Sequence, residues 1–313
     1  MKSFAEVEQA IRDYPVKWLA VAVAQDHTVL EAVAQAAKRN IAHAILVGDE
    51  KAIRETAEQH QIDLGESQIV HEREPTRAAA AATAMVNKGE ADILMKGHIH
   101  TDDFLRAVVN RDTGLRTSAL MSHVYLVEHP KRDQFLFISD GGMNIAPDLE
   151  MKAAIILNAV HTAQVFGVAE PRVAVLAAVE VVNPAMPATV HAATLAKMND
   201  RGQFSPKCIV DGPFAFDNAI SETAAKHKGI GGPVAGRADV LIVPDIEAGN
   251  QVAKSFVYMA GLTVAGLIVG AKAPIVLPSR ADNAASKLAS ITCATYCCNV
   301  TRRLRLKVGK VHF

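Results

Sequence analysis

Short apolar runs alternate with helical stretches along most of the chain, and this alternation restricts the possible folds more than any other feature. Each run is rich in β-branched or other apolar residues and is bounded by turn or charged residues, which is the pattern of a strand covered on both faces. Strands separated by helices are typical of a mostly parallel sheet with crossover helices. The expected strands are Trp18–Ala24, His43–Val47, Ile93–Met95, Val173–Ala177, Val240–Val243 and Pro274–Leu277.

Two helices between these strands have recognisable ends. Apolar residues recur at helical spacing from Thr28 to Asn40. An alanine-rich segment runs from Pro75 to Lys88, with the proline where a first helical turn tolerates it and Gly89 just beyond the end. The sequence therefore predicts the α/β class.

The length of 313 residues is more than most single hydrophobic cores support. The best boundary lies between Glu128 and Pro147, where a turn, a strand and a glycine-rich segment follow one another, and a second crossing is expected near Gly270–Pro274. Ligands bind beyond the carboxyl ends of strands in open α/β sheets, so we expect the chemistry in a cleft between two domains. The predicted domains are a discontinuous first domain, residues 1–138 and 272–313, and a second domain, residues 139–271.

Charge and cysteine content exclude several classes of function. Lys plus Arg and Asp plus Glu both number 33, so the formal net charge is zero and bulk charge cannot hold nucleic acid or anionic membrane. The four cysteines include no CxxC pair, which argues against a zinc ribbon or a thioredoxin-like motif. The N-terminal segment lacks a long apolar run, and the apolar stretch Phe256–Ala271 is too short to span a bilayer. We expect a soluble cytoplasmic protein.

The segment from Asp92 to Val109 is the first candidate site. The strand before it runs into Lys96, and Thr101 with Asp102 can cap the next helix, so an ammonium group and a helix N-terminus would face a space suited to phosphate. His98 and His100 raise the question of a metal site. Two loop histidines without a third ligand at a convincing spacing are more often simply solvated.

Two further segments carry polar groups that could bind an anion or a polar arm of a ligand. In residues 114–124 these are Arg116, Thr117, Ser118, Ser122 and His123; alternatively, the hydroxyls satisfy turn backbone and Arg116 forms an ordinary ion pair. In residues 211–222, Asp217 and Asn218 lie at an expected helix entrance, where a capping role is the alternative. The glycines that follow precede a strand instead of following one, so a dinucleotide-binding loop is not supported.

Residues 244–255 follow the strand that ends at Val243. Asp245, Glu247, Asn250 and Lys254 therefore lie where α/β folds place functional groups. Asn250 and Lys254 would share a helix face, and an ion pair between Glu247 and Lys254 is the structural alternative.

Residues 273–287 contain the most reactive combination. Ser279, Arg280 and Asp282 follow the end of a strand, and a hydroxyl, a guanidinium and a carboxylate together can position, bind and deprotonate a substrate. Asp282 could also cap the helix expected at Asn283–Ala294.

Together these segments resemble the phosphate acetyltransferase and phosphate butyryltransferase family. The overall pattern is more similar to the shorter butyryl-type members than to the longer acetyl-type members. The resemblance covers most of residues 15–291 and implies two three-layer α/β domains, similar to isocitrate and isopropylmalate dehydrogenases, with mostly parallel sheets and the active site in the interdomain cleft. It also implies reversible transfer of a short acyl group between coenzyme A and inorganic phosphate, without a metal or redox cofactor. The matching stretches are LMKGHIHTDDFLRAVVN, GLRTSALMSHV, DGPFAFDNAIS, GPVAGRADVLIVPDIEAGNQVAKS and PIVLPSRADNAASKLASI.

The resemblance implies that coenzyme A and phosphate are substrates and that the protein is a homodimer or a higher homo-oligomer. An acyl kinase as a functional partner is left open. His98 and His100 fall at positions that vary in the family pattern, which counts against a metal site. The segment from Cys293 to Phe313 departs from the family's final helix.

In this family context, Ser279 would hydrogen-bond a reacting oxygen, Arg280 would stabilise developing charge, and Asp282 would deprotonate the coenzyme A thiol. Acetyl-type relatives place their presumed base further along, at a spacing that lands on Ser286, so Glu247 or Asp217 could share that role. The side chains expected to bind substrate are Lys96, Thr101, Arg116, Ser122, His123, Asp217, Asn218, Asp245, Glu247, Asn250 and Lys254.

Two hypotheses from other classes remain open at this stage. A metal- and NAD-dependent dehydrogenase of the isocitrate type would share the fold, but its aspartate set and nucleotide site cannot be assembled from this sequence. A non-catalytic acyl-CoA-binding protein would bind coenzyme A without turnover. The preferred acyl chain, acetyl or butyryl, is not set by any motif.

Overall fold

The chain folds into two compact units in a computed structural model that describes residues 1–129, 132–304 and 310–312. The central unit contains Leu120–Val264 together with Met1–Ser3 and the described residues after 309. The split unit contains Phe4–Ala119 and the described residues from Ala265 onward to Leu304.

The sequence-based boundaries, after residues 138 and 271, lie later in the chain than the divisions between these units. Whether the two units are independently folding domains stays a prediction. The basic C-terminal segment, singled out as a departure from the family pattern, lies partly outside the described residues.

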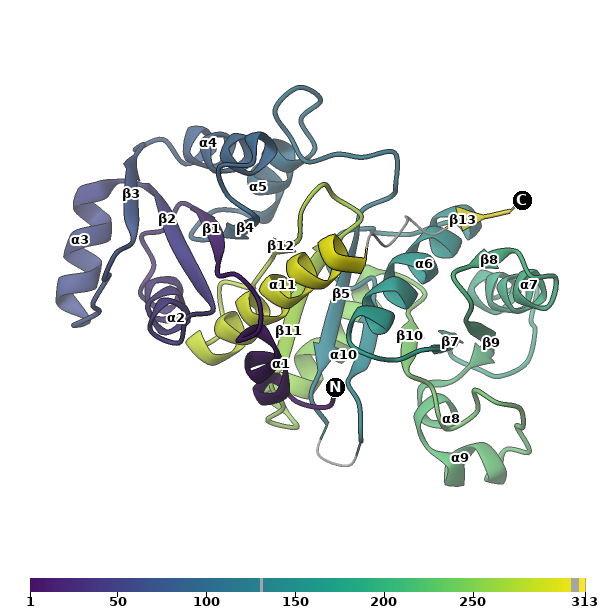
Figure 1. Cartoon of the computed structure of the whole chain (residues 1–313). Helices are drawn as coiled ribbons and strands as arrows, with labels where there is room; N and C mark the ends of the chain where they lie inside the picture. Colours follow the sequence, from purple (N-terminus) through teal and green to yellow (C-terminus); the bar gives the residue numbers. More distant parts are fainter. Residues whose placement is uncertain (130–131, 305–309, 313) are drawn as a thin grey trace. The chain divides into compact units, whose positions relative to one another are not determined.

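The split unit is built on a sheet with strand order β3-β2-β1-β4-β12-β11 (Figure 1). Adjacent strands are parallel except for β11, which is antiparallel to β12. Every residue of β4 is buried, as expected for strands covered on both faces. The elements are α1 Phe4–Ile11, β1 Lys17–Ala22, α2 His27–Lys38, β2 Ala42–Gly48, α3 Glu50–Gln59, β3 Gln68–His71, α4 Pro75–Lys88, β4 Ile93–Lys96, α5 Thr101–Val108, β11 Val264–Val269, β12 Ile275–Val276 and α11 Ala284–Leu304.

Successive strands are added first on one side of β1 and then on the other. From β1 the chain steps outward to β2 and β3, then returns through α4 to β4 on the other side of β1. Figure 1 shows α4 and α5 on one side of these strands and α2 on the other, where α2 and α11 pack together. The carboxyl ends of β1 and β4 therefore form a topological switch point, where connecting loops diverge and leave room for a ligand.

The sheet strands of the central unit, called the central sheet below, lie in the order β5-β6-β10-β7-β9. All neighbours are parallel except β5 and β6. A small antiparallel ribbon pairs β8 with β13. The elements are β5 Ser122–Val127, β6 Leu136–Ser139, α6 Leu149–Val165, β7 Arg172–Leu176, α7 Pro187–Asp200, β8 Phe204–Ser205, β9 Ile209–Phe214, α8 Phe216–Ile220, α9 Glu222–His227, β10 Val240–Ile242, α10 Ile246–Tyr258 and β13 Lys310–Val311.

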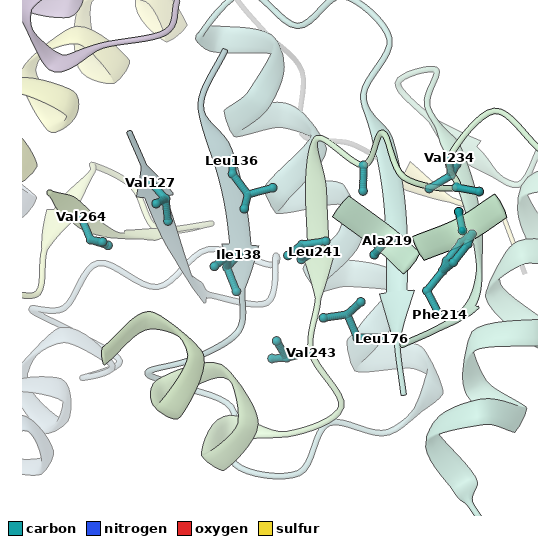
Figure 2. Packing of buried hydrophobic residues seen from close by; sticks show 14 residues of the cluster. Val127, Leu136, Ile138, Leu176, Phe214, Ala219, Val234, Leu241, Val243 and Val264 are labelled. Atoms are coloured by element: carbon teal, nitrogen blue, oxygen red, sulfur yellow. The ribbon is translucent and has the colours of Figure 1, made fainter. Parts of the chain in front are cut away.

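One face of the central sheet forms a continuous hydrophobic core (Figure 2). Ile138, Leu241 and Leu176 come from neighbouring parallel strands, and Phe214 and Ala219 extend the cluster toward α8. These side chains are at most 6% exposed, so the core fixes the strands whose carboxyl ends carry the polar residues described below.

The α/β class and the mostly parallel sheets predicted from the sequence are confirmed. All six expected strands exist, with ends that differ by at most two residues, and α4 has the predicted bounds, with Pro75 in its first turn and Gly89 in the left-handed conformation after it. Within the described residues, no helix is both long enough and apolar enough to cross a membrane.

Candidate active site

Lys96, the last residue of β4, has its side chain buried at the switch point of the split unit. The residue is 2% exposed, and its Nζ donates to the main-chain oxygens of Gly97 at 3.3 Å and Ile99 at 3.2 Å. Burial, reinforced by the positive charges of Arg280 and Lys287, lowers the pKa of Lys96 to about 8. Through these two hydrogen bonds the buried ammonium group fixes the loop that follows β4.

Gly97 must be a glycine at this position. A Cβ there would lie 2.2 Å from the main-chain oxygen of Val23, because the loop after β4 lies directly against the end of β1. Val23 itself has a φ of 59°, which is an unusual backbone conformation for a β-branched residue. The two strand ends are therefore held in close contact, with local strain at the switch point.

A second buried lysine holds the turn that follows β12. Lys287 is 2% exposed, and its Nζ donates to the main-chain oxygens of Ser279, at 3.4 Å, and Asp282. The carboxylate of Asp282 accepts the Ser279 N–H at 2.8 Å, which closes the turn on itself. Ser279 and Arg280 are exposed at the top of this turn, where their side chains can meet a ligand.

Positive charge is in excess around this turn. Arg280 and Lys287 lower the pKa of Lys96, whereas Asp282 and Asp26 raise it, so three cations and two carboxylates act on one another. Burial also lowers the pKa of Lys287, because water solvates a buried ammonium group poorly. An anion bound beside Arg280 would balance this excess.

The two histidines after β4 face different partners. His98 Nδ1 lies 3.5 Å from the Asp26 carboxylate, and His100 Nδ1 lies 3.3 Å from Arg280 Nη2. Searched over the described part of the chain, histidine, cysteine and acidic side chains form no group of three able to hold a metal ion. The expectation that no metal takes part stays a prediction.

Thr101 and Arg116 also belong to the split unit. Thr101 is the first residue of α5, but the capping role expected for it and Asp102 is wrong, because His100 is the N-cap residue and makes no side-chain cap. Arg116 is exposed in the loop that Thr117 ties to the Gly270 main-chain oxygen at 2.8 Å. Their proposed contacts with substrate stay predictions.

In the central unit, Ser122 and His123 lie in β5 and are buried. Ser122 Oγ accepts a hydrogen bond from Asn158 at 2.9 Å, which fits the structural interpretation of this hydroxyl. His123 is 1% exposed, its ring nitrogens have no hydrogen-bond partner among the described residues, and burial lowers its pKa to about 4. The imidazole is therefore neutral near pH 7 and packs edge-on against Tyr125.

Asp140, which no motif indicated, organises the same region. Its carboxylate accepts main-chain N–H groups of His123, Gly142 and Met143, and the side chain of Asn144 at 2.6 Å. Such a saturated, buried carboxylate fixes the loop after β6.

The residues after β10 have mixed roles. Asp245 caps α10 by accepting the Ala248 N–H at 2.8 Å, and Asn250 donates to the Gly141 oxygen at 3.3 Å. Glu247 and Lys254 are exposed on α10, and the ion pairs among the described residues include none between them. The alternative that explained them as an ion pair is therefore wrong, while their role in binding stays a prediction.

Asp217 and Asn218 lie inside α8 instead of capping it, since Ala215 is the N-cap residue. Lys228 bridges Asp217 at 3.1 Å and Glu180 at 3.4 Å, and the buried Asn218 amide donates to Glu180 at 3.3 Å. This polar cluster follows β7 and β9, at the same edge of the central sheet as Asp245.

The structure thus brings Lys96, Ser279, Arg280 and Asp282 together within the split unit, and it adds Lys287 and Asp26, which sequence analysis missed. A lysine in the first turns of a helix usually points to solvent, so Lys287 carries no local signal. Asp26 is detectable as a helix cap after a strand, and its carboxylate does accept the Val29 N–H at 3.0 Å.

Comparison with known proteins identifies the family of this chain. A family model described as "Phosphate acetyl/butaryl transferase" matches residues 5–79 and 72–295. A phosphate butyryltransferase of Clostridium beijerinckii is 47% identical over 293 residues, covering 94% of this chain and 97% of the relative. A phosphate acetyltransferase of Rhizobium meliloti is 44% identical over 286 residues, covering 91% of this chain and 90% of the relative.

Among solved structures, a branched-chain phosphotransacylase from Enterococcus faecalis superposes with a TM-score of 0.80 at 32% identity, covering 90% of this chain and 99% of the other. These matches give no support to the dehydrogenase alternative. Because the family model and its relatives span nearly the whole chain, the chain belongs to the phosphate acetyl/butyryl transferase family.

Proposed function

We propose that this protein is a phosphate acyltransferase that reversibly converts a short-chain acyl-CoA and inorganic phosphate into an acyl phosphate and coenzyme A. The observation that carries the proposal is the turn from Ser279 to Asp282 at the switch point. The buried ammonium group of Lys287 holds this turn, and the buried ammonium group of Lys96 lies near it. Both substrates are anions, and the excess positive charge of this site matches them without requiring a basic protein.

The exposed residues of the turn have complementary roles in the proposed reaction. A phosphate oxygen attacks the thioester carbonyl carbon, a C–O bond forms, the C–S bond breaks, and the thiolate leaves. Arg280 stabilises negative charge on the reacting oxygens, and the Ser279 hydroxyl orients one of them. Holding both substrates in one ternary complex supplies acceleration by positioning, with no acyl-enzyme required.

In the reverse direction, the coenzyme A thiol loses its proton before it attacks the acyl phosphate. We assign this proton transfer to Asp282, which shares the turn with Ser279. Glu247 and Asp217 are the alternative bases, and Ser286 is the position that acetyl-type spacing selects. Asp282→Asn should lower the rate of thiol attack, and an unchanged pH–rate profile would move the base to another group.

Phosphate-dependent release of free coenzyme A thiol tests the function. Acetyl-CoA, propionyl-CoA and butyryl-CoA are compared in parallel, with Arg280→Ala as the impaired variant, which should lose roughly 10²- to 10³-fold in kcat. Release that requires phosphate supports the transferase, and the kcat/KM ratios identify the preferred chain. Binding of coenzyme A without turnover would support the binding-protein hypothesis instead.

Several finer properties belong to the same proposal. The enzyme acts in the cytoplasm as a homodimer or higher homo-oligomer, and it uses coenzyme A as a substrate without a further cofactor. An acyl kinase acting beside it would consume the acyl phosphate. Size-exclusion chromatography with light scattering tests the oligomeric state independently of activity.

A further inference from the structure

His100 lies where it can orient the guanidinium of Arg280. It is the exposed residue just before α5, far from Arg280 in sequence, yet its Nδ1 lies 3.3 Å from Arg280 Nη2. A guanidinium has only donors, so Nδ1 must accept this hydrogen bond. The ring proton of a neutral His100 is therefore on Nε2.

The backbone of Arg280 is fixed, but no surrounding residues enclose its side chain. A hydrogen-bond acceptor beside the guanidinium is therefore needed to hold it in one orientation. The Ser279–Asp282 turn is held by Lys287 and by its own carboxylate, whereas the Arg280 side chain extends from it into solvent. Over the residues that the structure describes, His100 is the one group that accepts a hydrogen bond from this guanidinium. Holding one N–H fixes the planar fork in one orientation and reduces the rotamer freedom lost when an anion binds.

We propose that His100 is a positioning residue that aims Arg280 at the reacting oxygens. This rests on the proposed function, because Arg280 is assigned its catalytic role there. His98, two residues away, provides a matched control. Its Nδ1 lies 3.5 Å from the Asp26 carboxylate, and over the described residues the Arg280 guanidinium donates to His100 and not to His98.

The first test does not depend on catalysis. The side-chain NMR signals of Arg280, identified by their absence in Arg280→Ala, report rotation of the guanidinium about its Nε–Cζ bond. His100→Ala should speed this rotation, whereas His98→Ala should not change it. An unchanged Arg280 signal in His100→Ala would overturn the proposal whether or not the enzyme is active.

The second test is a double-mutant cycle on phosphate-dependent release of coenzyme A. His100→Ala should lower kcat roughly 2- to 10-fold, the range expected for the net contribution of one solvent-exposed hydrogen bond. In the Arg280→Ala background the same change should have no further effect, and His98→Ala should have the same effect in both backgrounds. His100→Asn should retain most of the activity, because its Oδ1 can accept where Nδ1 did.

Two kinetic results would contradict the inference while leaving the proposed function intact. One is a wild-type rate in His100→Ala, and the other is an equal loss from His100→Ala with and without Arg280. An inactive wild-type protein that binds coenzyme A would instead reject the proposed function, and the NMR measurement would still decide whether His100 orients Arg280.

Discussion

Replacing Lys96 with methionine should remove a pH dependence of stability that the buried ammonium group creates. Lys96 is 2% exposed, and its pKa falls from an ordinary value of 10.5 to about 8. Below pH 8 the amine is protonated in both the folded and the unfolded state. Between pH 8 and 10.5 the folded state has released the proton and the unfolded state still binds it, so the free energy of unfolding rises with pH.

The size of the rise follows from the two pKa values. The difference between 10.5 and about 8 corresponds to about 3 kcal/mol of stability gained by the wild-type protein as the pH passes through this window. The Lys96→Met variant lacks the ammonium group and therefore does not gain this stability as the pH rises. The variant also loses the hydrogen bonds to Gly97 and Ile99, which lowers its stability, but methionine has no proton to release, so the pH dependence that Lys96 creates is absent from the variant.

Urea unfolding between pH 7 and 10 measures this difference within the split unit. Trp18 is the single tryptophan, lies in β1 and contacts the His43 ring, so its fluorescence reports on the sheet that contains Lys96. Lys88→Met, at an exposed lysine of α4, controls for removing one positive charge. If the wild-type and Lys96→Met proteins differ by the same free energy at pH 7 and pH 10, the burial argument is refuted.

Three other changes test separate parts of the structure. Asp239→Asn should lower the free energy of unfolding by about 3–5 kcal/mol in urea titrations followed by circular dichroism, because this 1% exposed carboxylate pairs with Arg172 at 2.8 Å. The control is Asp200→Asn, which removes an exposed ion pair with Lys197 and should change the free energy of unfolding little. Gly97→Ala should lower stability by about 1–3 kcal/mol, since its Cβ would lie 2.2 Å from a main-chain oxygen, whereas Gly231→Ala meets nothing within 4 Å and should melt near the wild-type temperature. A chelator should leave phosphate-dependent turnover unchanged, and activity that is lost and then restored by added metal would point to the two histidines after β4.

The parts of the fold that the sequence predicted are those where local signals and burial agree. β1, β2 and β4 are apolar runs because both faces of a parallel sheet are covered, and α4 carries proline and glycine at its ends. The Ser279–Asp282 turn was predictable as a site because its polar residues directly follow an apolar strand. Each of these predictions uses only residues that are neighbours in the sequence.

The features that escaped prediction depend on distant partners. Asp211-Gly212-Pro213 is a combination of residues typical of a turn, yet this segment belongs to β9, where pairing with β7 at the edge of the sheet overrides the turn propensity. Lys287 resembles a surface lysine in sequence, and only the fold places it beneath the turn. The contact between His100 and Arg280 joins residues from two separate stretches of the chain, which no local pattern can indicate.

The discontinuity of the split unit has a consequence for how the protein emerges from the ribosome. Synthesis delivers β1 to β4 first, but β12, the strand that pairs with β4, arrives only after residues 120–264 of the central unit have been made. Until then β4 presents an open edge, and exposed edges of apolar strands recruit other chains. The nascent protein should therefore need protection by chaperones most strongly in this interval, and ribosome-bound chains ending near residue 264 should be the most prone to aggregate.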